Sequence, residues 1–230
     1  MKKNILITGA AGNLGKATVE RFIADGYSVI ATVTPGKSLG YATSVPVEVL
    51  EADLTNELKA QEVVSKTVAA HKTIDAAILL VGGFSPGKII DTDQAGIRKM
   101  FALNFESAFL VAKPVFLQMM KQPTGGRIVF VGARPALQAK DGKNMVAYGL
   151  SKSLIFKLSE YLNAEGATKN VVSTVVVPST IDTLVNRKAM PNADFSSWVS
   201  PESIAGIFSF IASAEASALR DPVFKMYGNA

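Results

Sequence analysis

Three glycines spaced three residues apart follow an apolar segment near the start of the chain. Residues 4–8 are typical of a buried strand, and Gly9, Gly12 and Gly15 come at the start of an expected helix, 13–25. Glycines placed in this way permit a tight turn, and they let the backbone approach a pyrophosphate at the positive end of the helix. The segment therefore predicts a dinucleotide cradle. A strand-to-helix turn without a ligand is the alternative.

Strand and helix patterns alternate along the remaining chain. We expect further strands at residues 28–33, 47–52, 75–81, 127–131, 171–177 and 223–227, and helices at 56–71, 94–120, 145–164 and 201–214. Such alternation is typical of a parallel sheet with helices on both faces. We therefore predict an α/β protein with a Rossmann-type, doubly wound parallel sheet of about seven strands.

The length of the chain bounds the number of domains. A chain of 230 residues, 48% of them hydrophobic, is long enough for one well-buried core and short for two. No linker or repeat interrupts it, so we expect a single domain over residues 1–230. The segment 34–46, rich in Pro, Gly and Ser, predicts a loop or a shortened helix. Pro114 predicts an irregularity in the helix expected at 94–120, because proline removes a backbone hydrogen bond.

The composition argues against several classes of protein. With no cysteine and with His71 as the single histidine, the chain has almost no material for a metal site, so no metal is expected. The net charge of +5 comes from scattered residues, which fits an anionic cofactor or a solvated surface rather than nucleic acid. The apolar runs at 5–7 and 76–81 are too short for a signal peptide or a membrane span. We therefore expect a cytoplasmic protein without membrane contact.

The end of the second expected strand carries no acidic residue. A carboxylate at this position binds the ribose 2′-hydroxyl of NAD and repels the 2′-phosphate of NADP. Val33 and Thr34 stand there instead, with Lys37 close by, so we predict that NADP is preferred over NAD. A solvated loop charge is the alternative for Lys37. Asp53 and Leu54, after the third strand, are expected to contact the cofactor, Asp53 at the adenine. An N-cap of the next helix is the other role for Asp53.

Tyr148 and Lys152 lie one turn apart on the same face of the helix expected at 145–164. The ammonium group favours the phenolate over a phenol whose ordinary pKa is about 10, so the pair predicts a proton donor and its electrostatic partner. Lys152 is also expected to bind the ribose of the cofactor. An exposed tyrosine and lysine on a helix surface are the alternative. Asn104, among apolar residues, needs partners for its amide, either a water that bridges to Lys152 or a packing contact between helices.

The segment Gly132-Ala133-Arg134-Pro135, after the fifth expected strand, lacks a serine. A hydroxyl that orients a substrate carbonyl would be expected at this place in such a site. Either the substrate needs no such donor, or Arg134 or another group supplies it.

The loop after the sixth strand is expected to hold the nicotinamide carboxamide through the Ile181 backbone and the Thr183 hydroxyl. A turn followed by a helix cap at Asp182 is the alternative. The residues expected to contact the cofactor are Gly9, Ala11, Gly12, Asn13, Leu14, Gly15, Val33, Thr34, Lys37, Asp53, Leu54, Val81, Gly82, Gly83, Lys152, Pro178, Ser179, Ile181 and Thr183.

These residues resemble the short-chain dehydrogenase/reductase superfamily over the whole chain, and within it the dihydropteridine reductases. Residues 75–86, 131–152 and 182–198 carry the narrower likeness. The resemblance implies hydride transfer from a nicotinamide cofactor to a quinonoid dihydropterin, with Tyr148 as proton donor and Lys152 as its partner. Dihydropteridine reductases similarly have no serine near the position of Ala133.

The resemblance also implies a homodimer or homotetramer built through the helices that carry Asn104 and Tyr148. A loop at about 179–200 is expected to border a small-molecule substrate. The residues expected to contact that substrate are Phe84, Ala133, Arg134, Tyr148, Asn186 and Trp198.

Two residues depart from dihydropteridine reductases. Val33 stands where they typically have an acidic residue that favours the unphosphorylated cofactor, and Asn104 follows the wider superfamily. We expect an NAD(P)-dependent oxidoreductase. A reductase or dehydrogenase of an ordinary ketone, aldehyde or alcohol is one alternative, and a non-catalytic NAD(P)-binding regulator is another. A pure regulator has little need for Tyr148, Lys152 and Asn104 together, which argues against it.

Overall fold

Seven parallel strands form one sheet in the order β3-β2-β1-β4-β5-β6-β7 in the computed structural model, which describes residues 2–229. The strands are β1 (Asn4–Thr8), β2 (Ser28–Val33), β3 (Glu48–Glu51), β4 (Ala76–Leu79), β5 (Gly126–Val131), β6 (Val171–Pro178) and β7 (Val223–Met226). The order reverses between β1 and β4, where open α/β sheets bind ligands at the carboxyl ends of their strands. The predicted doubly wound fold is confirmed.

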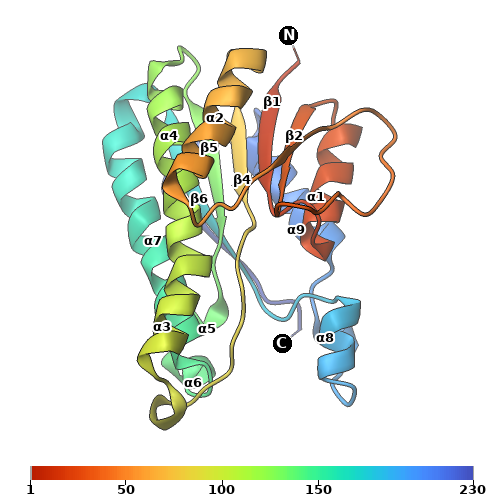
Figure 1. Cartoon of the computed structure of the whole chain (residues 1–230), viewed down its shortest axis with the longest axis vertical. Coiled ribbons are helices and arrows are strands. Elements are labelled where there is room, and N and C mark those ends of the chain that lie inside the picture. The colour runs from red at the N-terminus through yellow and green to blue at the C-terminus, as the bar shows by residue number, and fades with distance from the viewer. Residues whose placement is uncertain (1, 230) are drawn as a thin grey trace.

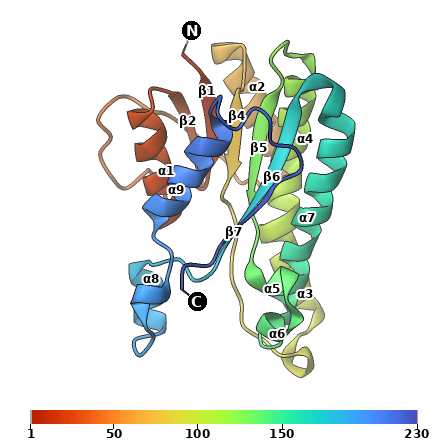
Figure 2. The same ribbon diagram turned by 180° about the vertical axis from the view of Figure 1, so that it is seen from behind.

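Helices cover both faces of the sheet (Figures 1 and 2). The covering helices are α1 (Asn13–Ala24) and α9 (Pro201–Ala212) on one face, and α2 (Glu57–His71), α4 (Ser107–Lys121) and α7 (Val146–Gly166) on the other. Phe22 and Phe208 are fully buried in the first layer, and Val115 and Met119 in the second. Apolar strands such as β1 are buried on both faces, which is the arrangement expected of a parallel sheet.

The expected strands and long helices lie within two residues of the observed ones, and the segment 34–46 is a loop. Several one-turn segments were not expected, because such segments are too short to carry a periodic signal. They are the helices α5 (Arg134–Leu137), α6 (Ala139–Gly142) and α8 (Leu184–Ala189) and the 3-10 turns Ile89–Asp91, Ala167–Lys169 and Phe195–Ser197.

The long helix before β5 is interrupted, but not at the expected place. It consists of α3 (Gln94–Phe101), a π-helical turn at Ala102–Glu106, and α4. Pro114 lies inside α4, so the prediction of an irregularity near this proline is wrong. The π turn contains the buried Asn104, and such turns are common where a helix presents a functional side chain.

The helical stretch Gln94–Lys121 is long and apolar enough to cross a membrane by length and composition alone. In the structure, 44% of its most apolar window is buried. Val111, Val115 and Met119 of α4 belong to the core between α2, α7 and the sheet. The stretch therefore packs as a core helix of this fold.

Candidate active site

The glycines after β1 form a turn that larger residues would obstruct. Gly9 has a φ of +66°, and a Cβ at this position would lie 3.2 Å from backbone atoms of Leu80 and Val81. A Cβ at Gly15 would overlap the carbonyl oxygen of Gly9. Glycine is therefore needed for α1 to begin this close to β1 and β4.

The N-terminus of α1 is open to a ligand. Gly12 is the N-cap and supplies no side-chain hydrogen bond, and Ala11, Gly12 and Asn13 are exposed. The amides of Asn13 and Leu14, in the first turn, have no partner within the helix. These donors and the helix dipole suit a pyrophosphate, so the residues present fit a dinucleotide cofactor.

Asp53 and Leu54, which follow β3, differ in their exposure and in their contacts. The exposed carboxylate of Asp53 accepts hydrogen bonds from the Thr55 hydroxyl at 2.7 Å and backbone N–H at 3.0 Å, and these bonds hold the pKa of Asp53 below its usual value. The N-cap of α2 is Asn56, which accepts from the Lys59 N–H, so a capping role for Asp53 is wrong. Leu54 is buried in the core.

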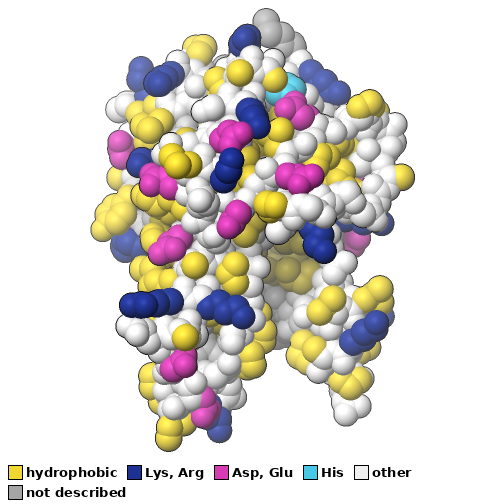
Figure 3. All heavy atoms as spheres, viewed as in Figure 1, with side chains coloured by type: hydrophobic (Ala, Val, Ile, Leu, Met, Phe, Trp, Pro, Cys, Tyr) yellow, Lys and Arg dark blue, Asp and Glu magenta, His cyan; other side chains and the backbone are white. Residues whose placement is uncertain are grey.

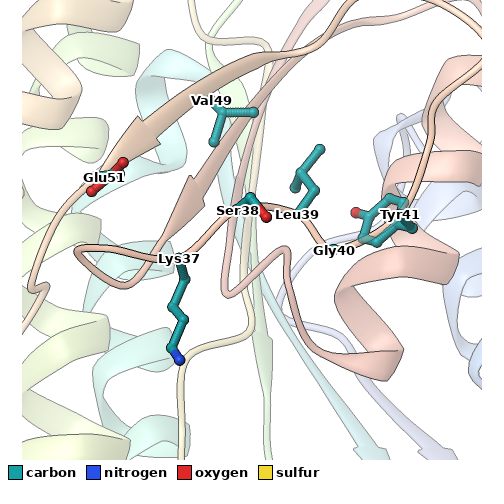
Figure 4. Close-up of a pocket in the computed structure, with 7 residues that line it drawn as sticks. All are labelled: Lys37, Ser38, Leu39, Gly40, Tyr41, Val49 and Glu51. Carbon is teal, nitrogen blue, oxygen red and sulfur yellow. The ribbon is translucent and has the colours of Figure 1, made fainter.

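The loop after β2 lies beside the glycine-rich turn. Val33 is buried at the end of the strand, whereas Thr34, Lys37 and Ser38 are exposed. The Tyr41 hydroxyl donates to the Ala10 carbonyl at 3.0 Å, which fastens the far part of the loop to the glycine-rich turn. Figure 4 shows the open pocket that this loop and β3 line together.

Lys152 and Tyr148 project from α7 beside the ends of β4 and β5. Lys152 is 8% exposed, and its ammonium group donates to the Val131 carbonyl at 2.8 Å. The ring of Tyr148 packs edge-on against Phe84, with 5.2 Å between ring centroids. A Cβ at Gly82 would lie 3.4 Å from Lys152 Nζ, so the segment after β4 runs directly past the ammonium group.

Asn104 connects that segment to α7. Its Oδ1 accepts from the Gly83 N–H at 2.9 Å, and its Nδ2 donates to Ser151 Oγ at 3.1 Å. The Ser151 hydroxyl donates in turn to the Tyr148 carbonyl at 2.8 Å. Asn104 is 1% exposed, and these partners satisfy its amide within the protein. Ser151 was missed from the sequence, although it lies three residues after Tyr148 on the same helix.

Burial shifts the pKa values of Tyr148 and Lys152 in the protein without cofactor. Burial raises the pKa of Tyr148 to about 12, and burial lowers the pKa of Lys152 to about 8. In the protein alone the pKa of the phenol is therefore raised by burial, contrary to the expectation that the ammonium group lowers it. Tyr148 is a phenol at neutral pH and can donate a proton.

The place of the absent serine is filled by a buried methyl group. Ala133 is 4% exposed and is the N-cap of α5. Arg134 Nε lies 3.0 Å from Asp141 Oδ2, and its guanidinium lies over the ring of Tyr227 at 5.4 Å. These contacts tie α5 to α6 and to the end of the chain. They give no support to Arg134 as a replacement for the serine.

The loop after β6 is held by its own polar groups. The Thr183 hydroxyl accepts from the Asn186 N–H as the N-cap of α8, and Asn186 Nδ2 donates to the Ile181 carbonyl at 2.8 Å. Asp182 binds Arg187 through two hydrogen bonds of 2.6 and 2.7 Å, so the alternative of a helix cap at Asp182 is wrong. The hydroxyl proton of Thr183 stays available to a carboxamide.

A hollow separates α8 from α3 and α6, which lie across from it at the same end of the molecule (Figures 1 and 3). Leu184, Val185 and Met190 are exposed on or beside α8, and Phe84 is 61% exposed next to Tyr148. Trp198 packs against Phe195 at the base of the α8 segment, with 4.8 Å between ring centroids. Apolar and aromatic side chains are thus exposed beside Tyr148, at Phe84, and on the α8 segment.

A family model of the short chain dehydrogenases matches residues 3–194, which is most of the chain. The chain belongs to the short-chain dehydrogenase family.

Known proteins resemble this short-chain dehydrogenase at modest identity. The acetoacetyl-CoA reductase of Acinetobacter sp. (strain RA3849) is 28% identical, over 77% of this chain and 73% of its own. The dihydropteridine reductase of Dictyostelium discoideum is 27% identical, over 89% and 85%. The solved structure of ElxO with NADP bound superposes with a TM-score of 0.91 at 22% identity, over 99% and 98%. The superfamily is confirmed, and dihydropteridine reductase is one of several distant relatives.

As a member of this family, the protein is an NAD(P)-dependent oxidoreductase that acts on a small molecule. Tyr148 and Lys152, the Asn104 bridge and the glycine turn lie at the carboxyl ends of β1, β4 and β5. This is the edge at which a doubly wound sheet binds a dinucleotide.

Asn104→Ala should destabilise this short-chain dehydrogenase by about 2 kcal/mol, because the variant removes a buried amide and leaves the half-buried Gly83 N–H without its acceptor. Thermal or denaturant unfolding measures the change. Asn192→Ala, at an exposed position, is the matched control and should be neutral. Equal stability of the two variants would contradict a bridging role for Asn104.

Proposed function

We propose that this short-chain dehydrogenase reduces a flat, conjugated acceptor of the quinonoid dihydropterin kind. The exposed ring of Phe84 carries this choice, because it stands edge-on to the proton donor Tyr148 and offers an aromatic face to a planar ring. Ala133 adds support, since a ring reduced at its own nitrogen atoms needs no hydroxyl to orient an isolated ketone. The dihydropteridine reductase of Dictyostelium discoideum, at 27% identity, agrees with this substrate class.

Tyr148, Lys152 and Asn104 have separate roles in the proposed reduction. The reduced cofactor, when bound, supplies a hydride to the acceptor. Tyr148 donates the proton from its Oη, and solvent restores it. Lys152 holds the ribose and, as a cation, stabilises the phenolate left on Tyr148. Asn104 positions α7 against the segment after β4 through Ser151 and Gly83.

The remaining contacts with the cofactor belong to the same proposal. The α1 N-terminus takes the pyrophosphate, Asp53 the adenine, and the Ile181 backbone with the Thr183 hydroxyl the carboxamide. Lys37 binds the 2′-phosphate, so NADP is preferred over NAD. One domain carries all of these contacts, with residues 179–200 as the substrate loop. Asn186 and Trp198 act within it by holding the loop in shape.

We infer a homodimer or homotetramer through α4 and α7. Both helices expose large apolar side chains away from the sheet, which is unusual for a surface that faces only water. They are Phe109 and Leu117 on α4 and Leu150 and Tyr161 on α7. Sedimentation of the purified protein tests this assembly, and a monomer at micromolar concentration would refute it.

Reduction of an ordinary ketone is the second candidate, and the 28% identity to an acetoacetyl-CoA reductase favours it. The test follows cofactor absorbance during oxidation of NADPH and of NADH, with quinonoid dihydropterin and with a panel of β-keto esters as acceptors. Turnover with the dihydropterin alone supports the proposal. Turnover with the esters alone overturns the pterin assignment, and cofactor binding without any turnover favours a non-catalytic regulator.

The pH profile of reduction should reflect Lys152. In the free enzyme its pKa is lowered to about 8, so the charged form that stabilises the phenolate exists below this pH and is lost above it. Tyr148 stays protonated throughout, because its pKa is raised to about 12. We expect kcat/KM, which reports groups of the free enzyme, to fall above about pH 8. A profile that stays flat to pH 10 would contradict this assignment.

A further inference from the structure

β2 ends without a carboxylate, but the neighbouring strand β3 carries one, Glu51, beside this end. β3 pairs in parallel with β2, and the register sets Glu51 directly beside Val33. Glu51 and Lys37 line the same pocket, which Figure 4 shows at the ends of these two strands. Glu51, 18 residues after Val33 in the chain, therefore lies next to the strand end at which an acid binds the ribose 2′-hydroxyl.

A hydrogen bond holds Glu51 in this place. Residues 34–37 form a tight turn in which the Lys37 N–H donates to the Thr34 carbonyl at 3.0 Å and Gly36 has a φ of +74°. The Gly36 N–H donates to Glu51 Oε2 at 2.7 Å. The carboxylate is therefore fastened to the same turn that carries Lys37.

Lys37 and Glu51 line this pocket without pairing with each other. Among residues 2–229, neither side chain takes part in an ion pair. In Figure 4 the Lys37 side chain extends away from the Glu51 carboxylate. Two side chains of opposite charge, not paired with each other, therefore line one pocket.

We propose that Glu51 is a specificity-determining residue that opposes Lys37 in the choice between NADPH and NADH. The inference rests on the proposed binding of the cofactor at this edge of the sheet. The 2′-phosphate is attracted by Lys37 and repelled by Glu51, whereas the uncharged 2′-hydroxyl of NADH can donate a hydrogen bond to the Glu51 carboxylate or to a glutamine amide oxygen in its place. The preference of the enzyme is thus the small difference between two opposed interactions.

The test measures dissociation constants for NADPH and NADH by calorimetry, with no acceptor present. Glu51→Gln keeps an acceptor for the Gly36 N–H and removes only the charge, so NADPH should bind about fivefold to tenfold more tightly while NADH changes less than about twofold. Lys37→Gln should weaken NADPH binding by a similar factor. Both effects should shrink at high salt, because the charges are exposed.

Glu48→Gln is the matched control. It makes the same change on the same strand, but Glu48 lies at the other end, where its carboxylate is 2.7 Å from His71 Nε2. The control should leave both dissociation constants unchanged. An equal change for the two cofactors in Glu51→Gln, or no change, would overturn the proposal. A wild type that binds NADH more tightly would refute the predicted NADP preference alone, since the Glu51→Gln shift is measured independently of it.

Discussion

Replacing Tyr148 by phenylalanine should lower the rate of acceptor reduction about a thousandfold and leave cofactor affinity unchanged. The substitution removes only the hydroxyl, so the ring can keep its edge-on contact with Phe84. The proposed reaction draws its proton from this hydroxyl, whose raised pKa keeps it protonated across the physiological range. Turnover followed by cofactor absorbance, together with calorimetric binding of the cofactor, separates the two effects.

Tyr161→Phe is the matched control for this experiment. Tyr161 lies on the same helix, α7, but is 67% exposed. Tyr161 lies more than three turns along α7 from Tyr148, so the loss of its hydroxyl should leave the rate within about twofold. If Tyr148→Phe kept more than a tenth of the wild-type rate, the proton would have to come from another group.

Replacing Lys152 by methionine should stabilise the fold while it removes most of the activity. Burial lowers the pKa of Lys152 from 10.5 to about 8, which corresponds to about 3 kcal/mol of unfavourable burial of the charge at neutral pH. The lost hydrogen bond to the Val131 carbonyl subtracts about 1 kcal/mol. We therefore expect the free energy of unfolding to rise by about 2 kcal/mol, with a reduction rate at least about a hundredfold lower.

The stability gain should depend on pH with a definite sign. Between about pH 8 and 10.5 the unfolded lysine holds its proton and the folded one does not, so the wild type gains stability as the pH rises. The advantage of Lys152→Met should therefore shrink across this range in denaturant unfolding. Lys157→Met, an exposed lysine on the same helix, should be nearly neutral at every pH. A destabilised Lys152→Met variant would contradict the account.

Local sequence patterns were sufficient to predict the features that depend on residues close together in the chain. The apolar runs predicted the buried strands, and the glycine spacing predicted the turn between β1 and α1. Tyr148 and Lys152 share a helix face because they are one turn apart, whatever the rest of the fold does.

Features that depend on contacts between segments far apart in the chain could not be predicted from local sequence patterns. Glu51 stands beside Val33 only because β3 joins the edge of the sheet in a particular register. Arg134 was assigned to the substrate, yet its partners, Asp141 and Tyr227, come from α6 and from the end of the chain. The pKa of Tyr148 depends on how deeply α7 is buried, and spacing along a helix carries no such information.

The π turn at Ala102–Glu106 also limits the lengths that this helix can have. A π turn accommodates a residue more than the α-helical turn it replaces. Deleting one residue would restore a regular helix but would rotate one flank by about 100° relative to the other. Either Asn104 would then lose Gly83 and Ser151, or the apolar face of α4 would turn away from the sheet. Variation in chain length among relatives should therefore fall in the loops and spare this turn.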